Sequence, residues 1–105
     1  MSKNDCYEVC KSYLNDLQTM IEQNDVEAFQ EWFDENVLDY QFIIGSDKSL
    51  LAANIYLEFG GPTVWIDTTE LGSIIYQWGD EQCDITLDST VRDFLNDYME
   101  EIYNY

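Results

Sequence analysis

Carboxylates are the side chains of this sequence that are numerous enough to carry a function. The chain has 105 residues, of which 22 are Asp or Glu and only 4 are Lys or Arg, so its formal net charge is −18. Carboxylates can act as acids and bases, bind cations, or present negative charge to a basic partner. Which of these roles applies depends on the residues that accompany them and on the elements that position them.

The residues that most often work with carboxylates in catalysis or metal binding are missing. The sequence contains no histidine, which is the commonest metal ligand and a frequent general base. It has no G-x-S-x-G motif, no glycine-rich phosphate loop and no Cys–His pair. The acids of 80–88 lack the alternating ligands, the sixth-position glycine and the final glutamate of an EF-hand loop. We therefore expect no enzyme, no metal site and no other cofactor.

The acidic residues instead form a set with almost no basic neighbours. No Lys or Arg lies between Ser49 and Val91, whereas ordinary protein surfaces mix both signs. Carboxylates four residues apart on a helix rise by about 6 Å, and those two apart on a strand by about 6.8 Å. Such rows can resemble successive phosphates. The negative electrostatic field of these residues attracts basic partners and argues against direct binding of nucleic acid or an anionic membrane. The alternative explanation for the charge is a halophilic or merely very soluble protein.

Aromatic side chains are expected beside these acids. Trp65 and Tyr56 are predicted to point outward from neighbouring strands, and such rings are preferred anchors at protein interfaces, where a partner arginine can stack on them. The alternative is that these rings belong to the core beneath a helix. The predicted partner-binding residues are Glu58, Trp65, Asp67, Glu70, Asp80, Glu81, Asp84, Asp93, Asp97, Glu100 and Glu101.

The helices that position these residues follow from the spacing of apolar side chains. Residues 5–23 and a segment that begins at Asn24 carry apolar side chains at steps of three and four, which predicts two helices joined by a short break. A last helix is expected to begin with Asp88 or Ser89 as its cap and to place its acids off a broad apolar stripe.

Between these helices the apolar spacing changes to two, which predicts three or four strands. Segments 53–59, 63–68 and 74–78 form the expected antiparallel meander, in which Ile55, Leu57 and Phe59 share one face while Tyr56 and Glu58 share the other. Segments 38–44 and 84–87 are further candidates. We expect a single α+β domain over 1–105, with two N-terminal helices, an antiparallel three- to four-stranded sheet and a C-terminal helix.

The cysteines and the apolar segments indicate the cellular compartment in which the protein is expected. Cys6 and Cys10 lie four residues apart on the first predicted helix and so share a face, while Cys83 lies far along the chain. An odd number of cysteines without a signal-peptide pattern favours reduced thiols in a reducing cytosol over a disulfide framework. No apolar run approaches the roughly 20 residues that a membrane span requires.

The stretch Leu57–Thr68, the sequence Tyr76-Gln77-Trp78-Gly79 and the acidic, tyrosine-rich last helix resemble small acidic proteins carried by phages and mobile elements. This resemblance covers roughly the C-terminal half of the chain. The whole chain is similar in character to phage anti-CRISPR proteins and other DNA-mimic anti-defence proteins. The resemblance implies a host partner that holds nucleic acid in a basic groove, and it assigns no role to an individual residue. A Cas9-type effector, which reads duplex DNA with arginines in a basic site, is the first choice; another nuclease or DNA-handling protein is the second.

The sequence thus predicts a non-enzymatic inhibitor that blocks access of DNA to a basic nucleic-acid-binding protein in the host cytoplasm. A monomer or weak dimer is expected, since the net charge opposes self-association. Two other functions stay open: an immunity protein that neutralises a basic nuclease toxin, and an acidic structural or accessory phage protein. Salt-dependent affinity for a partner would separate the first two functions from the third.

Overall fold

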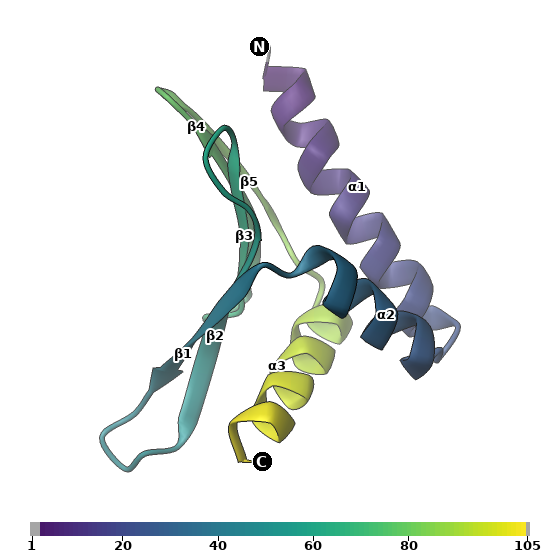
Figure 1. Ribbon diagram of the computed structural model, residues 1–105, viewed down its shortest axis with the longest axis vertical. Helices are drawn as coiled ribbons and strands as arrows, with labels where there is room; N and C mark the ends of the chain where they lie inside the picture. The colour runs from purple at the N-terminus through teal and green to yellow at the C-terminus, as the bar shows by residue number, and fades with distance from the viewer. Residues whose placement is uncertain (1–2, 105) are drawn as a thin grey trace.

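The computed structural model describes residues 3–104, with side chains from Cys6 onward, and contains three helices and one five-stranded sheet (Figure 1). The helices are α1 (Lys3–Glu22), α2 (Val26–Asn36) and α3 (Ser89–Asn104). The strands β1 (Asp39–Ile44), β2 (Leu50–Glu58), β3 (Thr63–Asp67), β4 (Ser73–Trp78) and β5 (Glu81–Thr86) pair in chain order, each antiparallel to the next. The predicted α+β class is confirmed, whereas the predicted number of three to four strands is wrong.

The two extra strands lie at the edges of the sheet, where apolar periodicity is weakest. Most residues of β1 are exposed, so little of its sequence is constrained to alternate. β5 begins three residues before the segment predicted for it, because a two-residue loop, Gly79–Asp80, joins the paired residues Trp78 and Glu81. Gly79 adopts a φ of +61°, which a tight hairpin loop of this kind requires and which glycine adopts without steric cost.

All three helices pack on one face of the sheet (Figure 1). α1 contacts β4 and β5, α3 contacts β2, and α2 packs on α1. Ile55, Ile66 and Ile74 lie side by side on the three central strands and are fully buried beneath these helices. None of the described helices covers the opposite face, where residues alternate with the buried ones and are only half-buried.

The second helix was predicted to begin at Asn24, whereas α2 begins at Val26. Asn24 adopts a φ of +53° and belongs to the turn that ends α1, so it does not cap the next helix. Asp25 is the cap, and its side chain accepts a hydrogen bond from the Ala28 backbone N–H at 3.0 Å. At α3 the predicted cap was Asp88 or Ser89, and the cap is Asp88, whose carboxylate accepts the Val91 N–H at 2.9 Å.

A disulfide joins Cys6 of α1 to Cys83 of β5, so the prediction of reduced thiols is wrong for these two residues. They are 77 residues apart in the sequence, and only the packing of α1 across β5 brings them together. Cys10 is free and fully buried. Burial, followed by the nearby charge of Asp84, raises the pKa of the Cys10 thiol to about 11. Within the described residues, no helix is long and apolar enough to cross a membrane.

Candidate binding surface

The sheet face away from the helices carries a row of apolar residues with an acid at each end. Strand pairing aligns Asp39, Tyr56, Trp65, Ile75 and Asp84 across all five strands. The three central residues are half-buried, and the two terminal carboxylates are exposed. We call these five residues the open-face row. It offers a partner an apolar centre and a negative charge at either edge of the sheet.

The rings of the open-face row belong to a small aromatic cluster. The centroids of Tyr56 and Trp65 lie 6.3 Å apart, and Tyr56 stacks on Phe59 at 5.2 Å with an interplanar angle of 22°. Phe59 is 53% exposed. The prediction that Trp65 points outward is therefore confirmed. For Tyr56 and Trp65, the alternative of a core position beneath a helix is excluded by their place on the uncovered face.

A β-bulge in β2 reverses the faces predicted for its last residues. The register shifts between Tyr56 and Glu58. Tyr56 pairs with Trp65 and Glu58 pairs with Val64, so β2 has one extra residue between two positions that are consecutive on β3. An extra residue of this kind turns the following side chains to the other face. Glu58 therefore faces the helices, and Phe59 joins Tyr56 on the open face instead of Ile55 and Leu57 in the core.

Glu58 consequently links the sheet to the helix layer. Its Oε2 accepts a hydrogen bond from the Tyr13 hydroxyl of α1 at 2.8 Å. Burial, and next the hydrogen bond to Glu58, raises the pKa of Tyr13, so its hydroxyl stays protonated and remains a donor. The predicted outward placement of Glu58 is wrong, and this carboxylate does not belong to the open-face row.

Two further predicted acids do lie on the open face. Asp84 ends the open-face row, and Asp67 occupies the adjacent position on β3 beside Asn54 and Ser73. The Asp67 carboxylate accepts the Thr69 N–H at 2.8 Å, which fixes its orientation at the end of the strand. This face therefore offers carboxylates and rings, which suit a partner rich in donors.

The predicted acids of the turns lie at opposite ends of β4. Glu70 lies in the turn before β4, where it adopts a φ of +55°, while Asp80 and Glu81 follow β4 in its hairpin with β5. A six-residue strand spans roughly 20 Å at about 3.4 Å per residue. The structure therefore does not bring Glu70 together with Asp80 and Glu81.

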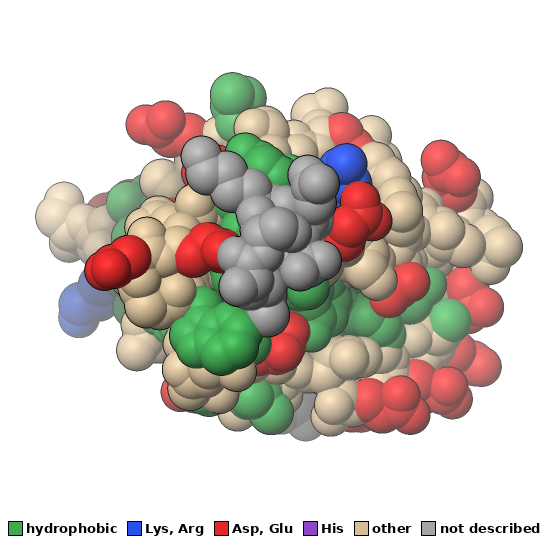
Figure 2. All heavy atoms as spheres, turned by 90° about the horizontal axis from the view of Figure 1, so that it is seen from above, with side chains coloured by type: hydrophobic (Ala, Val, Ile, Leu, Met, Phe, Trp, Pro, Cys, Tyr) green, Lys and Arg blue, Asp and Glu red, His purple; other side chains and the backbone are tan. Residues whose placement is uncertain are grey.

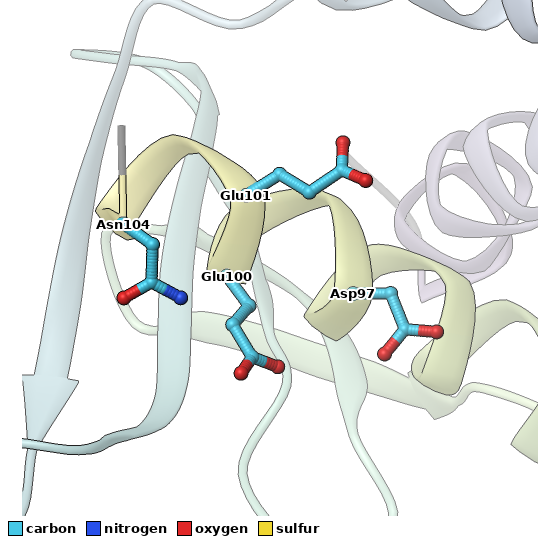
Figure 3. Close-up of a pocket in the computed structure, with 4 residues that line it drawn as sticks. All are labelled: Asp97, Glu100, Glu101 and Asn104. Carbon is cyan, nitrogen blue, oxygen red and sulfur yellow. The ribbon is translucent and has the colours of Figure 1, made fainter.

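The four predicted acids of α3 form a separate surface. Asp93, Asp97, Glu100 and Glu101 are all exposed, and α3 packs on the helix side of the sheet, opposite the open face (Figure 1). Asp97, Glu100 and Glu101 line a shallow hollow of about 610 Å³ together with Asn104. Figure 3 shows that the Glu100 and Glu101 side chains leave the helix in different directions, so their carboxylates do not converge on one point.

Few cations balance these acids. Within the described residues, Lys11 pairs with Glu8 at 4.0 Å and Arg92 pairs with Asp93 at 3.1 Å. Lys48 lies in the turn between β1 and β2, and the five strands contain no Lys or Arg. Figure 2, a view from above, shows many acidic side chains around the molecule and few basic ones. The part of the chain that the structure describes holds no cluster of three or more side chains suited to a metal ion.

Sequence reasoning missed Asp39, Phe59 and Ile75 as parts of the open face. Their placement depends on strand pairing and on the bulge, and no local signal in the sequence reveals either. Comparison of the chain with protein-family models, with curated proteins and with solved structures gives no match. The inference of function therefore rests on the charge and geometry of these surfaces.

Proposed function

We propose that this protein is a non-enzymatic inhibitor of a basic nucleic-acid-binding protein, with a CRISPR–Cas effector such as Cas9 as the first candidate. Its carboxylates occupy the positions of phosphates in the basic site of the partner and block access of DNA. The observation that carries this proposal is the open-face row, in which Tyr56 and Trp65 stand between Asp39 and Asp84 on a sheet without Lys or Arg.

The chemistry of nucleic-acid sites supports this choice of partner. Such sites hold phosphate with Arg and Lys side chains, and the guanidinium fork of arginine binds carboxylate as readily as phosphate. The faces of Tyr56 and Trp65 add a surface on which a guanidinium can stack. A net charge of −18 also steers a basic protein toward this surface and raises the rate of encounter.

The proposal is tested by capture of basic nucleases on the immobilised protein. The panel contains Cas9 with and without guide RNA, and each capture is repeated with competing duplex DNA and with increasing NaCl. We expect one nuclease to bind and to be displaced by both DNA and salt. Capture that DNA does not disturb would contradict mimicry, and absence of any capture would contradict the whole proposal and favour a structural role.

A pair of matched double variants tests the surface. Asp67→Asn with Asp84→Asn removes two charges from the open face but keeps an acceptor for the Thr69 N–H, while Glu8→Gln with Asp16→Asn removes two charges from α1. We expect the first pair to weaken binding of the captured nuclease about tenfold or more, as a loss of roughly 1.4 kcal/mol requires. Titration calorimetry that shows equal losses for both pairs would contradict a role for the open face.

A further inference from the structure

A second surface holds a hollow that is lined by residues from the end of α2, the start of β1 and α3. Its volume is about 410 Å³, and its lining includes Phe33, Asp34, Tyr40, Tyr98 and Ile102. This volume lies at the small end of the range of protein binding pockets, about 300–1,000 Å³. The hollow meets the open-face row at Asp39, which also lines it, but its rings lie on the helix side of the sheet.

Three aromatic residues line this hollow. The Phe33 centroid lies 6.0 Å from that of Tyr40 and 5.1 Å from that of Tyr98, with an interplanar angle of 52° in each pair. Phe33 is 8% exposed and forms the deep part of the cluster, whereas Tyr40 is 36% exposed and its ring is accessible. Tyr40 and Tyr98 are therefore the rings that can contact a ligand, and Phe33 supports them from beneath.

Carboxylates lie beside these rings, since Asp34 and Asp39 both line the hollow. Burial raises the pKa of Tyr98, and the negative charges of Asp34 and Glu101 raise it further, so both carboxylates act on the Tyr98 hydroxyl. Glu101 lines an adjoining hollow that Tyr98 and Ile102 share. Neither of the ion pairs in the described residues involves Asp34 or Glu101, and no Lys or Arg lines either hollow. The site is negative and its charge is not neutralised from within the described chain.

We infer that this hollow binds a guanidinium group, presented by an arginine side chain of a polypeptide partner. A planar guanidinium stacks on aromatic faces and pairs with carboxylates in a fork, so one group satisfies both kinds of wall. A hard divalent cation fits less well, because it requires several oxygen ligands while much of this wall is aromatic. The inference does not depend on whether the partner binds nucleic acid.

The test uses the tripeptide acetyl-Gly-Arg-Gly-amide and its citrulline counterpart, titrated at low ionic strength into the isotope-labelled protein. Citrulline keeps the planar shape and most donors of arginine but carries no charge. We expect the arginine peptide to shift the ring signals of Phe33, Tyr40 and Tyr98 to saturation and the citrulline peptide to leave them nearly unchanged. Equal shifts from both peptides, or arginine shifts spread over the surface without a maximum at these rings, would overturn the inference.

Variants with equal net charge separate ring stacking from general attraction to an acidic protein. Tyr40→Leu removes one ring of the hollow, and Tyr7→Leu makes the same substitution at an exposed tyrosine of α1. With the Kd read from the Tyr98 ring, Tyr40→Leu should weaken binding about two- to fivefold, and Tyr7→Leu should leave it unchanged. Asp34→Asn, at an exposed helix position, should also weaken binding, and it keeps the test available if Tyr40→Leu proves unstable. Equal effects of Tyr7→Leu and Tyr40→Leu, or no effect of Asp34→Asn, would overturn the site.

Discussion

Asp88 shows how one exposed side chain joins two helices. Its carboxylate accepts the Val91 N–H at the start of α3 and a hydrogen bond from the Gln18 amide of α1 at 2.7 Å. The hydrogen bond from Gln18, and next that from Val91, lowers the pKa of Asp88 below its ordinary value of 3.8. A folded-state pKa that is depressed in this way stabilises the fold above the ordinary value, and the stabilisation is lost as the pH falls through the folded-state pKa.

We therefore expect Asp88→Ala to lower the free energy of unfolding by about 1 kcal/mol at neutral pH, the usual cost of losing a helix cap. Urea denaturation at a series of pH values measures the difference from the wild type. The difference should be constant above about pH 5 and shrink as the pH falls below the ordinary pKa of Asp88, 3.8. Ser89→Ala is the matched control, and an equal loss from it would show that Ser89 provides the cap.

At the scale of elements, the Cys6–Cys83 disulfide ties the first helix to the last strand of the sheet. A cross-link over 77 residues restricts the unfolded chain and is expected to stabilise the fold by about 3–5 kcal/mol. Dithiothreitol should therefore lower the free energy of unfolding of the wild type by about this amount. Guanidinium denaturation with and without the reductant measures the change.

Cys10 provides the control for this prediction, because it is as deeply buried as Cys6 and lies one helical turn away. The variant Cys10→Ala should keep its sensitivity to dithiothreitol, whereas Cys6→Ala should be insensitive. Alkylation of the denatured, unreduced wild type should modify a single thiol by mass spectrometry. Modification of all three cysteines would contradict the disulfide.

The elements that local periodicity specifies were predictable from the sequence, and those that depend on pairing were not. Alternation in β3 correctly separates buried Val64 and Ile66 from outward Trp65. The same alternation fails at the end of β2, because the run from Tyr56 to Phe59 looks regular and the bulge exists only relative to β3. The Cys6–Cys83 bond was missed for a related reason, since cysteine counting contains no information on which helix crosses which strand.

At the scale of the whole molecule, the one-sided layering decides which acids can act together. Composition identified an acidic surface, but the predicted set is split, with Asp67 and Asp84 on the open face and Asp93 and Asp97 on α3 behind the sheet. Helix and strand patterns specify which side of an element is apolar. They do not specify whether helices cover one face of a sheet or both, so the two surfaces became separable only with the tertiary structure.

The same layering concentrates like charge in a small volume. The protein has a net charge of −18 and a radius of gyration of 13.7 Å. This radius is comparable to the Debye length of about 10 Å at 0.1 M salt, so many of the charges interact with one another. Folding brings these charges together, so their mutual repulsion opposes the compact state, and screening by salt should relieve it. If NaCl relieves about 1 kcal/mol between low and physiological ionic strength, the melting temperature should rise by roughly 4–8 °C for a chain of this size.

Scanning calorimetry over a series of NaCl concentrations at neutral pH measures this rise, and the same series near the ordinary pKa of carboxylates, about 4, is its control. Protonation removes part of the negative charge there, so the salt-dependent rise should be smaller. A rise of equal size at both pH values would indicate a general effect of salt on apolar burial. A melting temperature that falls with NaCl at neutral pH would mean that screening weakens favourable contacts, such as the few ion pairs, more than it relieves repulsion among the carboxylates.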